Sequence, residues 1–237
     1  MSKKTKHSNA AIIDFKAYTF FTQSIGMSVE DIIVMGNVAT GKSHIAKVLK
    51  HNLLNVVMYP EFIHNDTFAM EMLARRFKNR VSALTFQNFI LDKWKLFYEK
   101  NKDKEGIRLY ERLPDDAVKI FAKMSLTPNE YAIQTERLTE LNKLLPSYDD
   151  MHNENCTWIR YENNFTKDLT PLISAVKDAG TKFVVVEVRS KTAFDNYKYR
   201  DRKEEFYTEY EISELQKVYN TFADEHIRRI GCNVYEM

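Results

Sequence analysis

The chain has 237 residues, of which 44% are hydrophobic and 29% charged, and its formal net charge is only +2. This size suits one medium domain with a packed core, and the balance of acids and bases argues against a protein that coats nucleic acid. No apolar run reaches the roughly 18 residues of a membrane helix. The two cysteines, Cys156 and Cys232, fit neither a zinc spacing nor a disulfide framework. We therefore expect a soluble cytoplasmic protein without nucleic-acid or membrane partners.

Residues 1–30 are interpreted as an N-terminal extension with an amphipathic helix over 10–25, followed by a single domain over 31–237. Short apolar runs predict strands, and stretches with helical periodicity lie between them. The predicted strands are 31–36, 55–61, 106–112, 182–189 and 232–237, and the predicted helices are 42–53, 66–100, 128–145, 168–180 and 211–229. Segment 147–156 is interpreted as a polar linker. This alternation favours an α/β fold with a five-stranded parallel sheet and helices on both faces.

The first predicted strand leads into GNVATGKS, which matches the phosphate-loop pattern G-x-x-x-x-G-K-S/T without a mismatch. In such a loop the backbone N–H groups surround a phosphate, and the following helix presents its N-terminus to the same anion. The lysine adds charge for the outer phosphates, and the hydroxyl can bind Mg²⁺. The alternative is a chance match in an ordinary strand–turn–helix. The pattern predicts a triphosphate site formed by Gly36, Asn37, Val38, Ala39, Thr40, Gly41, Lys42 and Ser43.

Charged residues follow the second and third predicted strands, at the sheet edge where open α/β folds bind ligands. Glu61 could accept the proton of an attacking hydroxyl, or it could be a solvated loop residue. Glu111 could hold a metal ion or its waters, and Arg112 could stabilise charge on a transferred group. The alternative for this second pair is a surface salt bridge.

Two further features concern recognition. Gln87 shares an apolar helical face with Ile90 and Trp94, where it could pair with a nucleobase edge or bond to its own backbone surroundings. The cluster YRDRKEE, within 196–207, could close on phosphates as a lid or be the solvated face of a charged helix.

These segments, in this order, resemble the deoxynucleoside kinase family. The resemblance rests on GNVATGKS, PEF, FKNRVSALTFQNF, YERLPDDAVKIFAK and YRDRKEE. It implies a three-layer P-loop kinase fold with a lid around 196–207, a homodimer, and phosphorylation of a deoxynucleoside 5′-hydroxyl by ATP with Mg²⁺. By position, it implies that Glu61 is the catalytic base, that Gln87 binds the nucleobase, and that Glu111 holds the metal. It also implies that Arg112 lies at the 5′ end of the substrate, that Arg200 and Arg202 bind the phosphates, and that Glu205 lies near the 3′-hydroxyl. In the expected mechanism Phe86 or Trp94 packs on the base, Ser43 also binds Mg²⁺, and Lys42 and Arg112 stabilise the transferred phosphate.

The chain also departs from the family pattern. Phe77 stands where the family usually has a tyrosine that holds the 3′-hydroxyl, and Leu113 replaces a serine. Pro60 precedes Glu61, whereas the family has proline after the glutamate. Ala117 stands where some members have aspartate, which by resemblance favours pyrimidine nucleosides. Two alternatives stay open: a thymidylate-type nucleoside monophosphate kinase and a non-catalytic P-loop nucleotide-binding protein.

Overall fold

The computed structural model describes residues 29–61, 66–164, 168–199 and 207–237. The helix expected over 10–25 and three residues of the expected lid, Arg200, Arg202 and Glu205, lie outside the described residues.

The sheet has six parallel strands in the order β2-β3-β1-β5-β4-β6. The strands are β1 Asp31–Met35, β2 Val56–Tyr59, β3 Ile107–Glu111, β4 Cys156–Glu162, β5 Phe183–Arg189 and β6 Asn233–Glu236. The parallel α/β fold is confirmed, but the predicted number of five strands is wrong by one. The missed strand is β4, whose first residue lies in the segment interpreted as a linker.

Strand β4 was missed because its sequence, CTWIRYE, carries a charge in its middle. Arg160 Nε donates to Glu187 Oε2 on the neighbouring strand at 3.0 Å, and Trp158 Nε1 donates to the same oxygen at 2.8 Å. The charge is thus neutralised by a residue 27 positions away, which no local pattern indicates.

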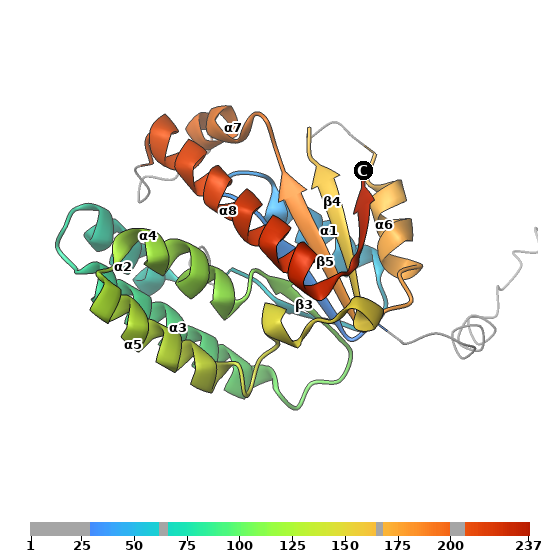
Figure 1. Cartoon of the computed structure of the whole chain (residues 1–237), viewed down its shortest axis with the longest axis horizontal. Coiled ribbons are helices and arrows are strands. Elements are labelled where there is room, and N and C mark those ends of the chain that lie inside the picture. Colours follow the sequence, from blue (N-terminus) through green and yellow to red (C-terminus); the bar gives the residue numbers. More distant parts are fainter. Residues whose placement is uncertain (1–28, 62–65, 165–167, 200–206) are drawn as a thin grey trace, which may run out of the picture.

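Helices cover both faces of the sheet (Figure 1). The main helices are α1 Lys42–Asn52, α2 Thr67–Phe77, α3 Ala83–Asn101, the π-helix η3 Asp116–Ala122, α4 Lys123–Ser125, α5 Pro128–Leu141, α6 Thr170–Lys177, α7 Ala193–Tyr199 and α8 Glu209–Ile230. Short 3-10 turns lie at η4 Tyr148–Asp150 and η5 Asn153–Asn155.

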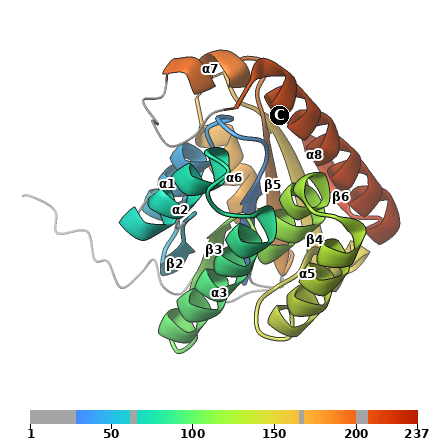
Figure 2. The ribbon, with the colours of Figure 1, turned by 90° about the vertical axis from the view of Figure 1, so that its left-hand side faces the viewer.

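Alternation along β1 explains the three layers, because successive side chains of a strand point to opposite faces. Ile32 and Val34 pack in the apolar cluster formed with α1 and α6. Ile33 and Met35 pack in the cluster formed with α2, α3, α5, η3 and α8. Helices α3 and α5 lie side by side in that second layer (Figure 2).

The helix predicted over 66–100 is two helices. Asn79, two residues after the end of α2, adopts a φ of 54°, in the left-handed region. Ser82 then caps α3, its Oγ accepting a hydrogen bond from the Thr85 N–H at 3.1 Å. No helix within the described ranges is both long and apolar enough to cross a membrane.

Candidate active site

A cavity of about 850 Å³ lies at the carboxyl ends of β1 and β3 and is enclosed by α2, α3, η3 and α8. It brings together residues from segments far apart in the chain. Those selected by the sequence patterns are Val38, Ala39, Gly41, Lys42, Ser43, Glu61, Phe77, Phe86, Gln87, Glu111, Arg112 and Ala117. Gly36, Asn37 and Thr40 complete the loop behind this lining.

The phosphate loop has the backbone that an anion cradle requires. Gly36 has a φ of +139°, and a Cβ atom there would lie 2.3 Å from the Val188 carbonyl oxygen, so no other residue fits without a backbone shift. Gly41, at a φ of 95°, precedes α1 and supplies no side-chain cap to its N–H groups. Lys42 Nζ donates to the Asn37 carbonyl at 2.5 Å. The uncapped helix start and the charged lysine fit a bound phosphate group.

Two asparagine side chains fasten the loop to distant segments of the molecule. Asn37 Nδ2 donates to the Ile212 carbonyl on α8 at 2.9 Å, and Asn163 Nδ2 donates to the Thr40 carbonyl at 2.7 Å. Asn163 follows β4 directly, so the missed strand also positions the loop. The sequence patterns did not select Asn163, and only the tertiary structure identifies it.

Glu111 joins the loop to the end of β2. Ser43 Oγ donates to Glu111 Oε1 at 2.5 Å, and the Glu61 N–H donates to Glu111 Oε2 at 3.3 Å. Glu111 is only 3% exposed. Hydroxyl and carboxylate oxygens are hard ligands of the kind that Mg²⁺ prefers, so these two side chains fit a magnesium ion beside a bound triphosphate.

Arg112 pairs with Glu61 in an ion pair largely shielded from solvent. Its Nε donates to the Tyr219 hydroxyl at 3.0 Å and its Nη2 to the Gly36 carbonyl at 3.4 Å. Burial lowers the pKa of Arg112, but attraction to Glu61 outweighs it and the pKa lies above the usual value. The guanidinium therefore stays charged between the loop and Glu61. Its φ of 69° is strained for a non-glycine residue, as often occurs at functional sites.

A buried carboxylate organises the segment after Arg112. Asp116 Oδ2 accepts hydrogen bonds from the Leu113 N–H at 2.8 Å and from the Tyr148 hydroxyl at 3.1 Å. Burial raises the pKa of Asp116. Leu113, which replaces the family's serine, is itself buried. Asp116 thus caps the turn that contains Pro114, and the turn is tied to Tyr148 in the segment interpreted as a linker.

Gln87 lies on the cavity side of α3 and is 5% exposed. Its Oε1 is buried and has no hydrogen-bond partner among the residues that the structure describes. Ile90 and Trp94, on the same helical face, also line the cavity. A buried amide oxygen without a partner is costly, which points to a ligand donor at this position.

The cavity lining also contains Asn196 and Tyr207, the two ends of the expected lid, and three residues that the sequence patterns missed: Arg76, Asn79 and Glu211. The rings of Phe77 and Tyr207 meet edge to face at 5.0 Å. The Tyr207 N–H donates to the Tyr197 hydroxyl at 2.7 Å, which joins α7 to the residues before α8. Only the fold brings α8 to α2, so no spacing rule would have selected Glu211 together with Arg76 and Asn79.

A phosphate loop between a buried strand and a helix, at the carboxyl edge of a parallel sheet with helices on both faces, defines a P-loop protein of the kinase type. The family model for deoxynucleoside kinases (dNK) matches residues 32–161, which is more than half of the chain. The chain therefore belongs to the deoxynucleoside kinase family and is an enzyme of that family.

Three solved structures of deoxyadenosine kinase from M. mycoides share the fold. The one with products dCMP and a flexible dCDP bound has a TM-score of 0.58 and 20% identity, covering 86% of this chain and 89% of the other. The one with bound dATP has a TM-score of 0.53 and 18% identity, covering 87% and 90%. The one with bound dCTP has a TM-score of 0.54 and 15% identity, covering 87% and 89%. No curated protein sequence matches the chain.

Proposed function

We propose that the chain transfers the γ-phosphate of ATP to the 5′-hydroxyl of a deoxynucleoside, with pyrimidine nucleosides preferred. The observation that carries this proposal is that one cavity is lined both by the phosphate loop and by Glu61. A nucleoside kinase needs both, because the acceptor hydroxyl must lose a proton while the donor phosphate is held in line.

In this mechanism Glu61 accepts the 5′-hydroxyl proton as the oxygen attacks the γ-phosphorus. Arg112 holds Glu61 in place through their ion pair, and it stabilises charge on the transferring oxygens together with Lys42. The resemblance assigns Arg200 and Arg202 to the phosphates and Glu205 to the 3′-hydroxyl; all three lie outside the described residues.

Ser43 and Glu111 are the residues that would hold Mg²⁺, and the ion would neutralise part of the phosphate charge. The fit rests on their two oxygen atoms lying 2.5 Å apart beside the loop.

Base recognition is assigned to Gln87, whose buried Oε1 would accept a hydrogen bond from the nucleobase. Trp94 lies two helical turns further along the same face, and Ala117 on η3 adds no polar group. Phe86 contributes an aromatic wall. The bulky Trp94 indole restricts the space for the base, so a single-ring pyrimidine fits more readily than a two-ring purine. This supports the pyrimidine preference.

One observation favours a second candidate, phosphorylation of a nucleoside monophosphate. Arg76 lines the cavity and forms no ion pair with any described residue. A cation in this position could meet a phosphate already carried by the acceptor. Glu61 and Gln87 support the nucleoside as acceptor, since a phosphate acceptor needs no general base.

A phosphorylation panel tests the proposal: four deoxynucleosides and thymidylate, each with ATP and Mg²⁺. We expect thymidine or deoxycytidine to give the 5′-monophosphate fastest. Fastest turnover of thymidylate would support the second candidate instead. ATP binding without product from any acceptor would indicate a non-catalytic nucleotide-binding protein. The homodimer implied by the resemblance is a separate prediction, which sedimentation of the full chain would test.

A further inference from the structure

The two cysteines of the chain lie where β4 and its neighbour β6 begin: Cys156 is the first residue of β4, and Cys232 directly precedes β6. Thr157 of β4 pairs with Asn233 of β6 in a parallel ladder, so the preceding residues, Cys156 and Cys232, occupy the next register position. Residues opposite each other on adjacent strands project to the same face. Both cysteines are buried, and both belong to the same apolar cluster.

The separation of adjacent strands suits a covalent link. Neighbouring strands lie about 4.8 Å apart, and the Cα atoms of disulfide-bonded cysteines are usually about 4.4–6.8 Å apart. Cys232 also lies at a place where the backbone can adjust. It follows Gly231, whose φ of 64° ends α8, and it precedes the first residue of β6.

The nearby Cys156 thiol is the largest influence on the pKa of Cys232. Together with the charge of Arg160, and against the opposing effect of burial, it places that pKa below the usual value. The thiolate is the nucleophilic form of cysteine, and a lower pKa favours it. Cys232 is therefore the side chain that would react first with an oxidant. It is 8% exposed, whereas Cys156 is fully buried.

We propose that Cys156 and Cys232 form a reversible disulfide that staples the C-terminal strand β6 to β4. With hydrogen peroxide as oxidant, the Cys232 thiolate attacks one peroxide oxygen, which gives a sulfenic acid and hydroxide. The Cys156 sulfur then attacks Sγ of Cys232, the S–O bond breaks, and the hydroxyl leaves as water. Two thiols and one peroxide thus give one disulfide and two waters.

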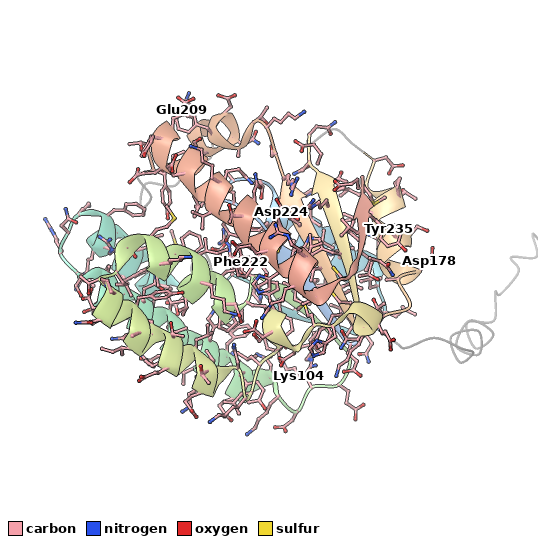
Figure 3. The ribbon with its side chains drawn as sticks, viewed as in Figure 1. Lys104, Asp178, Glu209, Phe222, Asp224 and Tyr235 are labelled. Carbon is pink, nitrogen blue, oxygen red and sulfur yellow. The ribbon has the colours of Figure 1, made fainter. Side chains whose placement is uncertain are left out.

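The link would stabilise the least protected part of the sheet. Strand β6 is an edge strand of four residues, all exposed, with Tyr235 visible on it in Figure 3. It follows α8 directly, and the opposite half of α8 lines the cavity with Glu211 and Leu215. The disulfide would therefore fix the C-terminal end of α8, a helix that supports the active site. Both cysteines lie outside the cavity lining.

The test is treatment of the folded full chain with hydrogen peroxide, followed by denaturation, thiol alkylation and peptide mass spectrometry. We expect loss of both free thiols, a Cys156–Cys232 linked peptide with two fewer hydrogen atoms, and recovery of both thiols with dithiothreitol. Oxidation should raise Tm by about 5–10 °C, because it closes a long loop in the unfolded chain. It should also slow amide exchange of β6 by about tenfold or more.

Cys232→Ser and Cys156→Ala are the controls, and neither should show a peroxide-dependent rise in Tm. The mass measurement on the unaltered chain is decisive even if a variant folds poorly. Oxidation of Cys232 to a sulfinic acid while Cys156 remains alkylatable, a disulfide between two chains, or two unreacted thiols would each overturn the proposal. Phosphoryl transfer is not a readout of this test, so its result is independent of the proposed function.

Discussion

Replacing Glu61 by glutamine tests the proposed base with little change in shape. Glutamine keeps an oxygen that can accept a hydrogen bond from Arg112, but it cannot accept the proton of the substrate hydroxyl. General-base catalysis contributes about 10²–10⁴ in rate, which corresponds to about 3–5 kcal/mol in the activation free energy. We expect Glu61→Gln to lower kcat by about 10²- to 10⁴-fold. The KM for ATP should be unchanged, because the phosphate loop is untouched.

The same contacts determine how much stability Glu61→Gln loses. Glu61 is 17% and Arg112 10% exposed at their side chains, and removing one partner of a buried pair costs about 3–5 kcal/mol. Arg112 retains Tyr219 and the Gly36 carbonyl, and the new amide replaces part of the lost bond. We therefore expect a loss of about 1–3 kcal/mol, or a Tm lower by a few degrees.

The assay is ADP release with thymidine as acceptor, alongside thermal unfolding. Glu105→Gln is the matched control, because Glu105 is exposed and lies outside the cavity lining. Wild-type kcat in Glu61→Gln, with the same Tm as the control, would refute the assignment of the base.

Three further predictions follow from the site and its surroundings. Lys42→Ala should lower turnover by about 100- to 1000-fold and weaken ATP binding, measured by calorimetry, while circular dichroism shows the native fold; near-normal ATP affinity would contradict the role of the loop. Gln87→Leu should raise KM for the nucleoside about tenfold or more and leave KM for ATP unchanged, whereas an equal rise in both would argue against base recognition. Asp149, held by Lys119 and Arg229 against the opposing effect of burial, has its pKa lowered to about 2 from 3.8. Its contribution to stability is thus present above about pH 4 and lost as pH falls toward about 2, so Asp149→Asn should show a smaller acid-induced drop in Tm; an identical drop would count against the pairing.

The site residues that the sequence identified were those whose signal is local. The phosphate loop is contiguous, so its glycines, lysine and serine appear together in one motif. Glu61, Glu111 and Arg112 could be selected because strand ends are visible as boundaries of apolar runs. Gln87 was noticeable as a polar residue in an apolar helical stripe.

The features that were missed depend on contacts between distant segments. Strand β4 was not predicted because it contains the charged Arg160. Glu187, which neutralises Arg160, lies on another strand. Tyr219 holds Arg112 from a helix about 100 residues further along the chain, and nothing in its neighbourhood indicates that role. The break between α2 and α3 had a local signal, the cap at Ser82, but the continuous apolar spacing across it favoured a single helix.

The most direct test of the central claim uses a bisubstrate molecule in which a polyphosphate joins adenosine to the 5′-oxygen of thymidine. If the phosphate loop and the nucleoside site share one cavity, the molecule should bind more tightly than either ATP or thymidine, and both should displace it. Lys42→Ala and Gln87→Leu should each weaken its binding. Displacement by ATP alone, with full affinity in Gln87→Leu, would contradict the claim that donor and acceptor meet in this cavity.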